Sequence, residues 1–180
     1  MKLLIEDNFL KSPDEIRNLA LLMPYTCSED MSIDVGWRGY RTEEWGNYSN
    51  KVLDNISEMI LDKVAKFYDV EGQRILSYFH ISHEGTKNTL GNFNTKKYHI
   101  DPDKSYAGVI YLNPNAPKET GTSILDGSKN QIVSVDNVYN RLFAYPGDHI
   151  HAPSDLFGDD IRNGRMTVTF FLERNWSWSS

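Results

Sequence analysis

The sequence predicts an α+β, mainly β domain in which N-terminal helices pack on a C-terminal β-sandwich. Two observations carry this prediction. Residues 50–70 have apolar side chains at three- and four-residue steps, the period of an amphipathic helix. From residue 73 onward, short β-rich runs alternate with turns, which is typical of a sandwich or barrel. A length of 180 residues suffices for one domain with a sizeable core.

The chain opens with a predicted short strand at residues 3–10, followed by a helix. In this helix Ser12 is the expected N-cap and Pro13 the first helical residue. Glu15, three residues after the cap, completes a capping box, in which two side chains bond the free N–H groups of the first turn. We expect the helix to run to about Met23.

Residues 27–50 have no regular pattern and contain three glycines and two tryptophans. A loop of this length in a compact domain is often functional. The alternative, at least as well supported, is a surface meander with Trp37 and Trp45 packed into the core.

The second helix is the clearest local prediction. Its expected apolar stripe is Val52, Ile56, Met59, Ile60, Val64 and Phe67. The predicted β-rich runs are RILSYFHIS (74–82), KKYHID (96–101), YAGVIYLN (106–113), GTSILDG (121–127), IVSV (132–135), NRLFAYPGD (140–148) and RMTVTFFLE (165–173).

Side chains alternate between the two faces of the last strand. One face is apolar and belongs to the core. The other carries Arg165, Thr167, Thr169 and Phe171, so it is either solvated or lines a polar pocket inside the sandwich.

Composition and charge exclude several classes of protein. The net charge is −6 and no dense Lys/Arg block is present, so we expect no nucleic-acid partner. No stretch approaches a membrane span, and the apolar run at the start is too short for a signal peptide. The single cysteine, Cys27, excludes an internal disulfide and favours a reducing compartment. We therefore expect a cytoplasmic protein.

A histidine and an aspartate, His99 and Asp101, stand two residues apart before an apolar run. On an extended chain both side chains point the same way, which suits two ligands of one ion but also an ordinary strand end. His149 and His151 follow a later Pro-Gly turn. Two histidines and one carboxylate form the facial triad of non-haem Fe(II) oxygenases. Arg165, fourteen residues after His151, suits a dicarboxylate cosubstrate beside such an iron.

The order of these motifs resembles the Fe(II)/2-oxoglutarate-dependent dioxygenases, and within them the prolyl 4-hydroxylase-like branch. The motifs are HxD, Tyr-Leu-Asn, Gly-Thr, PGDxxH and a late arginine, spread over residues 75–173. The resemblance implies a double-stranded β-helix (a cupin-like jelly roll) with supporting N-terminal helices. We expect a single domain, with the helices and loop in residues 1–72 and the β-helix core in residues 73–175.

The resemblance also implies roles for individual residues. The iron ligands it implies are His99, Asp101 and His151. Arg165 matches the basic residue that grips the far carboxylate of 2-oxoglutarate, with hydroxyl support from Tyr111 and Thr167. Two alternatives stay open: His149 in place of His151, and Arg162, in the loop at 154–164, as a weaker candidate than Arg165.

The implied activity is hydroxylation with Fe(II), O2 and 2-oxoglutarate, the last being converted to succinate and CO2. The resemblance suggests a peptidyl or free amino-acid substrate, such as proline. Nucleic-acid demethylases of the superfamily carry a further arginine pattern that does not follow Arg165 here. The competing functions are a metal-binding jelly-roll module without oxygenase activity and a cupin-like metalloenzyme that does not use 2-oxoglutarate. The oligomeric state stays open.

Overall fold

The computed structural model of the chain describes residues 1–33, 35, 37–71, 73–87, 98–128 and 130–173. The helices in these residues are α1 (Pro13–Leu22) and α2 (Lys51–Tyr68), with short 3-10 turns η1 (Ser28–Asp30), η2 (Trp45–Asn47) and η3 (Lys118–Thr120). The strands are β1 (Leu4–Glu6), β2 (Thr26–Cys27), β3 (Tyr40–Arg41), β4 (Arg74–Ser82), β5 (Lys104–Tyr111), β6 (Thr122–Leu125), β7 (Gln131–Val135), β8 (Leu142–Pro146), β9 (Ile150–Pro153) and β10 (Arg165–Glu173).

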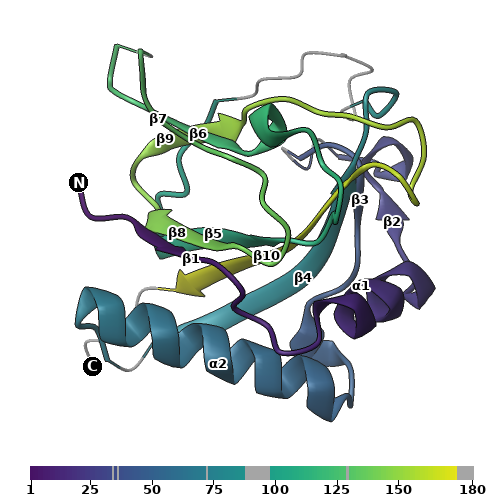
Figure 1. Cartoon of the computed structure of the whole chain (residues 1–180), viewed down its shortest axis with the longest axis horizontal. Helices are drawn as coiled ribbons and strands as arrows, with labels where there is room; N and C mark the ends of the chain where they lie inside the picture. The colour runs from purple at the N-terminus through teal and green to yellow at the C-terminus, as the bar shows by residue number, and fades with distance from the viewer. Residues whose placement is uncertain (34, 36, 72, 88–97, 129, 174–180) are drawn as a thin grey trace.

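These strands form two antiparallel sheets. The major sheet has the order β1-β8-β5-β10-β4-β3-β2, and the minor sheet has the order β7-β6-β9. Figure 1 shows both helices on the outer side of the major sheet and the minor sheet across from its other side. The predicted layers, helices on a β-sandwich, are confirmed.

Helix α1 begins at Pro13 and is followed by its C-cap, Met23, as predicted. The predicted capping box is wrong, because the Ser12 side chain makes no capping hydrogen bond. Its ψ angle of 66° departs from the extended conformation that aims an N-cap hydroxyl at the first-turn N–H groups.

Helix α2 is capped by Asn50, whose side chain accepts hydrogen bonds from the N–H groups of Val52 and Leu53. The helix ends at Asp69 in the left-handed conformation, with φ of 57°. Its buried residues are Leu53, Ile56, Ile60 and Val64.

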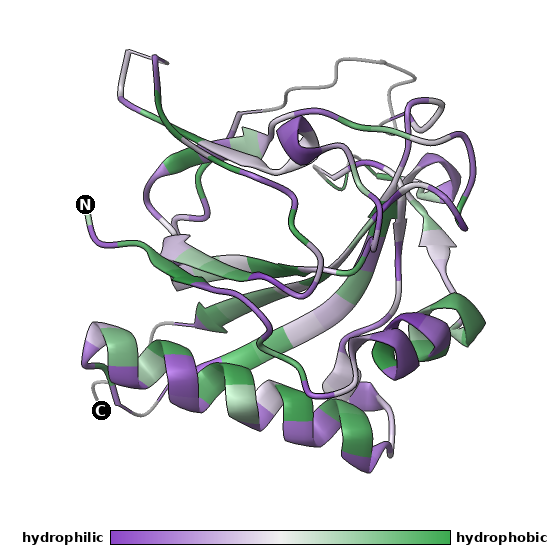
Figure 2. Ribbon diagram, viewed as in Figure 1, coloured by the Kyte–Doolittle hydropathy of each residue, from purple (hydrophilic) through white to green (hydrophobic). Residues whose placement is uncertain are grey.

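The predicted apolar stripe of α2 was wrong at two positions. Val52 is 49% exposed and Met59 is 39% exposed, whereas Leu53 is fully buried. The buried face of the helix is therefore narrower than the predicted stripe, and some apolar side chains of the helix are exposed to solvent. Figure 2 shows the mixture of apolar and polar residues along this helix.

The described residues form two hydrophobic cores, one on each side of the major sheet. The larger core joins the helices to the sheet, and the smaller core lies between the two sheets. On β10, Met166, Val168, Phe170 and Leu172 all belong to the helix-side core. The opposite face, which begins with Arg165, therefore points between the sheets, where Arg165, Thr169 and Phe171 line a cavity.

The predicted strands at 74–82 and 165–173 have the bounds of β4 and β10. The short strands β2, β3 and β9 were not predicted. The predicted run at 96–101 falls partly outside the described residues, and its described part makes an isolated bridge at His99 rather than a strand. None of the helices in the described residues is long and apolar enough to cross a membrane.

Candidate metal centre

His99 and His151 are brought side by side by two backbone hydrogen bonds. The N–H of His99 donates to the carbonyl of His151 at 3.1 Å, and the N–H of His151 donates to the carbonyl of His99 at 2.9 Å. His151 lies on β9, which pairs with β6 in the minor sheet. The bridge thus fixes the segment that carries His99 against the edge of the minor sheet.

Asp101 is held by the turn that carries the PGD motif. Its N–H donates to the carbonyl of Gly147 at 2.7 Å. A Cβ atom on Gly147 would lie 2.5 Å from the carbonyl oxygen of Lys104 and 2.9 Å from that of Asp101. The close approach of the two turns therefore requires glycine at this position, and it places the Asp101 side chain beside the histidines.

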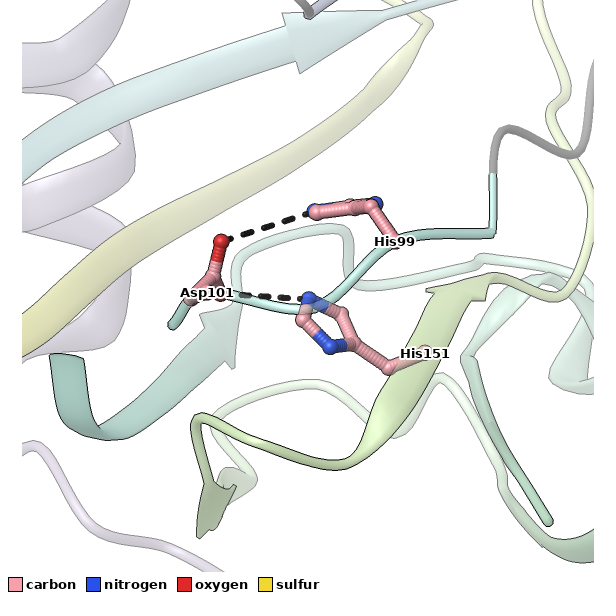
Figure 3. Close-up of side chains that lie close together, drawn as sticks. All are labelled: His99, Asp101 and His151. Atoms are coloured by element: carbon pink, nitrogen blue, oxygen red, sulfur yellow. Dashed lines mark ion pairs between the residues drawn. The ribbon is translucent and has the colours of Figure 1, made fainter. Parts of the chain in front are cut away.

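The predicted triad converges. Ligand atoms of His99, Asp101 and His151 all lie within 4.8 Å of one another. Figure 3 shows both rings directed at the carboxylate: Nε2 of His99 lies 3.8 Å from Oδ1, and Nε2 of His151 lies 3.4 Å from Oδ2. Separations of this kind let one ion contact all three side chains, because metal–ligand bonds to nitrogen and oxygen are about 2 Å long.

The tautomer of His151 directs the lone pair of its Nε2 atom toward Asp101. A ring nitrogen of His151, Nδ1, lies 2.9 Å from the carbonyl oxygen of His149, which can only accept, so Nδ1 carries the hydrogen. Burial lowers the pKa of His151 to about 3, so the ring is neutral at physiological pH. Nε2 is therefore unprotonated, which is the form that binds a metal ion.

The facing atom of Asp101 also lacks a hydrogen-bond donor. Its Oδ2 is buried and has no hydrogen-bond partner among the described residues. Burial raises the pKa of this carboxyl group. Two acceptor atoms thus face each other in a buried place, an arrangement that a cation between them satisfies. The donor set, two imidazoles and one carboxylate, fits a non-haem Fe(II) ion.

His149 is not part of the cluster. Its ring Nδ1 lies 2.8 Å from Oδ1 of Asp148, next to it in the chain. It acts on the cluster through its carbonyl group, which fixes the tautomer of His151. The geometry therefore places His151, and not His149, beside His99 and Asp101.

Arg165 is buried inside the sandwich, with 4% of its surface exposed. Its Nε donates to the carbonyl of Thr120 at 2.9 Å, and Nη2 donates to the carbonyl of Gly121 at 3.2 Å. Burial lowers its pKa, but a guanidinium stays charged in proteins. Among the described residues no carboxylate forms an ion pair with it, so the site holds a buried cation that suits an anionic ligand.

Tyr111 and Thr167 are cross-strand partners beside this arginine. The Tyr111 hydroxyl bonds Oγ1 of Thr122 at 2.7 Å, and its ring centroid lies 5.4 Å from the Arg165 guanidinium. The Thr167 hydroxyl bonds Thr169 at 3.0 Å. Thr169 borders the cavity described next, and neither Tyr111 nor Thr167 is among the residues that line it.

A cavity of about 130 Å³ is bordered by two residues of the triad and by Arg165. His99 and His151 border one part of it and Arg165 another. It is also bordered by Arg41, from the 27–50 segment considered above as a functional loop, and by His80. The lining also includes Trp37, Arg38, Tyr145, Thr169 and Phe171.

His80 is a hydrogen-bonded histidine that borders the cavity. Its Nε2 lies 2.7 Å from the carbonyl oxygen of Arg38, so Nε2 carries the hydrogen. Burial lowers the pKa of His80 to about 3, so the ring is neutral and Nδ1 remains an acceptor. No sequence motif marks this role; it follows from the pairing of His80 with Arg41 and Thr167 on neighbouring strands.

The two tryptophans of the 27–50 segment have different environments. Trp45 is 1% exposed and packs on Phe79 with ring centroids 4.8 Å apart, as the core interpretation predicted. Trp37 borders the cavity instead. The core interpretation therefore holds for Trp45 and not for Trp37, and a functional role of the segment stays a prediction.

Solved structures share this architecture. A prolyl 4-hydroxylase from Pseudomonas putida superposes with a TM-score of 0.65 at 13% identity, covering 97% of this chain and 93% of that one. The chain has the fold of the prolyl 4-hydroxylases. A Trichoplax adhaerens prolyl hydroxylase in complex with a hypoxia-inducible-factor peptide fragment gives 0.62 at 16% identity, covering 95% and 83%. The 2-oxoglutarate complex of a viral collagen prolyl hydroxylase from Paramecium bursaria Chlorella virus-1 gives 0.63 at 10% identity, covering 97% of each chain.

These likenesses confirm the predicted double-stranded β-helix with N-terminal helices. No protein-family model and no curated protein sequence matches the chain.

Proposed function

We propose that the protein is an Fe(II)- and 2-oxoglutarate-dependent dioxygenase that hydroxylates a small-molecule or peptidyl substrate. One observation carries the proposal. Ligand atoms of His99, Asp101 and His151 lie within 4.8 Å of one another, and the cavity bordered by the two histidines is also bordered by the buried cation Arg165. A metal ion and a dicarboxylate cosubstrate together satisfy both groups.

His99, Asp101 and His151 would hold the ferrous ion. When bound, it would activate O2 and couple the oxidative decarboxylation of 2-oxoglutarate, which yields succinate and CO2, to hydroxylation of the substrate. The carbonyl of His149 keeps the ring of His151 in the tautomer that binds metal.

Arg165 would bind the far carboxylate of 2-oxoglutarate, with the Tyr111 hydroxyl beside it and Thr167 in support. The backbone carbonyls that accept from Nε and Nη2 of Arg165 fix the direction of the guanidinium without neutralising it. Its charge is thus left for a ligand. The viral hydroxylase of the same fold was solved with 2-oxoglutarate, which supports this assignment.

The same arginine argues against the two competing functions. A metal-binding module and a cupin-like enzyme without 2-oxoglutarate have no use for a buried guanidinium that lacks a counter-ion, because burying an unpaired charge is costly. The Trichoplax structure of the same fold holds a peptide, which supports a peptidyl substrate as one possibility alongside a free amino acid.

The proposal is tested by succinate release. The iron-loaded protein is incubated with 2-oxoglutarate, O2 and panels of peptides, amino acids and nucleosides. We expect slow succinate formation alone and faster formation with members of the peptide or amino-acid panels. A protein that neither binds 2-oxoglutarate nor converts it with any candidate contradicts the proposal.

A further inference from the structure

A second arginine borders the cavity, on the strand next to β4. Arg41 on β3 stands opposite His80 on β4, and His80 stands opposite Thr167 on β10. Residues directly opposite each other on neighbouring strands have side chains on the same face of a sheet. Arg41 thus faces the interior between the sheets and borders the cavity that also contacts His99 and His151.

Two aromatic rings hold the Arg41 guanidinium in place. Its central carbon lies 4.7 Å from the ring centroid of Trp37 and 4.7 Å from that of Tyr78. Stacking between two rings fixes the plane of the guanidinium and leaves its in-plane N–H groups for an acceptor.

The polar atoms at this place lack partners. Nε of Arg41 and the hydroxyl of Tyr78 are both buried and have no hydrogen-bond partner among the described residues. Asp101 is attracted to Arg41, but the two side chains form no ion pair within 4 Å. An unpaired buried guanidinium and an unpaired buried hydroxyl are costly, unless a ligand supplies the acceptors.

The charges around the cavity also require a further anion. Three of its bordering side chains are cationic: Arg38, Arg41 and Arg165. Asp101 belongs to the triad. The two positive charges of a divalent ion held there and the two negative charges of 2-oxoglutarate would balance. Arg38 donates to the carbonyl of Glu84 at 2.9 Å and to Oγ1 of Thr86 at 3.1 Å, and the carboxylate of Glu29 attracts it electrostatically. Arg165 has its place in the proposed cosubstrate site, so Arg41 is left for the substrate.

We infer that Arg41 binds a carboxylate of the substrate, and hence that the substrate is a carboxylic acid. The inference rests on the proposed function. Nδ1 of His80, the strand neighbour of Arg41, is an acceptor and suits a hydroxyl or N–H group of the same molecule. The carboxylate is either the α-carboxylate of a free amino acid or an acidic side chain in a peptide, since both present the same two oxygens to a guanidinium.

Calorimetry on protein loaded with Zn(II) and 2-oxoglutarate tests this without turnover. The probes are free L-amino acids, the same amino acids as C-terminal amides, and capped peptides with and without one aspartate or glutamate. The proteins are the wild type, Arg41→Met and a matched control, Arg74→Met. Arg74 lies at the start of β4, with its side chain 72% exposed, so its replacement removes the same charge outside the cavity.

We expect the wild type and the control to bind at least one free carboxylate about tenfold or more tightly than its amide, the value of a charge-assisted pair. Arg41→Met should lose this preference while it retains its affinity for 2-oxoglutarate, which also shows that it is folded. If Arg41→Met does not fold, Arg41→Lys replaces it, and we expect a smaller loss because the charge remains without the planar fork. A preference for the free amino acids identifies an α-carboxylate, and one for the acidic peptides identifies a side-chain carboxylate.

The inference is overturned if no probe distinguishes the wild type from the Arg41 variants, or if acids and amides bind alike. It is also overturned if Arg41→Met loses 2-oxoglutarate, because Arg41 would then hold the cosubstrate. Wild-type protein that binds 2-oxoglutarate through Arg165 but shows no Arg41 effect leaves the proposed function intact. Wild-type protein that fails to bind 2-oxoglutarate contradicts the proposed function instead.

Discussion

Nε2 of His151 lies 3.4 Å from Oδ2 of Asp101, and the hydrogen of the neutral imidazole is on the other ring nitrogen, bonded to a backbone carbonyl. Two lone pairs therefore face each other inside the protein. Without a cation this contact is unfavourable, and with a cation both atoms become ligands. This contact between two metal ligands therefore lowers the free energy of unfolding of the metal-free protein.

Replacing Asp101 with asparagine should have opposite effects on stability and on metal binding. In Asp101→Asn the amide N–H₂ can donate to Nε2 of His151, so the unfavourable contact becomes a hydrogen bond. We expect the metal-free variant to gain about 1 kcal/mol in the free energy of unfolding, measured by denaturant titration with a chelator. The same variant should lose Fe(II) binding.

Asp103→Asn is the matched control, since it removes a carboxylate from the same turn at an exposed position. It should change the free energy of unfolding by less than about 0.5 kcal/mol and retain the metal. A metal-free Asp101→Asn protein less stable than the wild type would contradict the lone-pair arrangement.

Arg165→Lys tests the cosubstrate site. Lysine keeps the charge but cannot present two parallel N–H groups to a carboxylate. We expect the dissociation constant for 2-oxoglutarate to rise by about ten- to a hundredfold, with Fe(II) binding retained. Calorimetry on the metal-loaded variant measures both quantities. An unchanged affinity for 2-oxoglutarate would contradict the assignment of Arg165 as the residue that binds its far carboxylate.

The two tryptophans of the 27–50 segment should respond differently to truncation. Trp45→Ala removes a ring packed on Phe79 in the helix-side core, so we expect a loss of about 3–5 kcal/mol in the free energy of unfolding. Trp37→Ala removes a ring at the cavity and should cost less than about 1 kcal/mol while it weakens substrate-stimulated turnover. Thermal unfolding and succinate release measure the two effects, and equal stability losses would refute the division.

The stability of the metal-free protein should fall as the pH falls below about 6. Burial lowers the pKa of His80 to about 3 from 6.5, so between these values the unfolded chain binds a proton that the folded chain does not. The free energy of unfolding should then decrease by up to about 1.4 kcal/mol per pH unit for this group. Burial of His151 acts in the same direction.

His80→Gln isolates the contribution of His80, because glutamine retains an N–H donor for the carbonyl of Arg38. We expect a shallower dependence of the free energy of unfolding on pH between about 6 and 3. A slope equal to that of the wild type would show that the His80 ring is accessible to protons in the folded protein.

The sequence alone predicted the parts of the fold that have a strong local pattern. The β-rich runs at 74–82 and 165–173 marked β4 and β10, and the order of the HxD and PGDxxH motifs, which resembles the Fe(II)/2-oxoglutarate-dependent dioxygenases, marked the triad. Short β3 has no period to detect, because it forms by pairing with β4. The position of Arg41 at the cavity therefore could not be predicted from the sequence, because only the register of β3 on β4 places it opposite His80.

Two features of the helices were predicted wrongly from local sequence, because tertiary packing determines them. Val52 and Met59 are apolar and fit the helical period, yet the buried face of the helix contains Leu53 instead. Val52 and Met59 are therefore exposed. Ser12 stands at a helix start but its hydroxyl makes no capping bond.

The most direct measurement is an anaerobic titration of Fe(II) into the protein saturated with 2-oxoglutarate, followed by visible absorption. We predict a weak charge-transfer band that saturates at about one iron per chain and is absent from His99→Ala and Asp101→Asn. No band in the wild type, or a band of equal intensity in the two variants, would contradict the assignment of residues 99, 101 and 151 as the iron site.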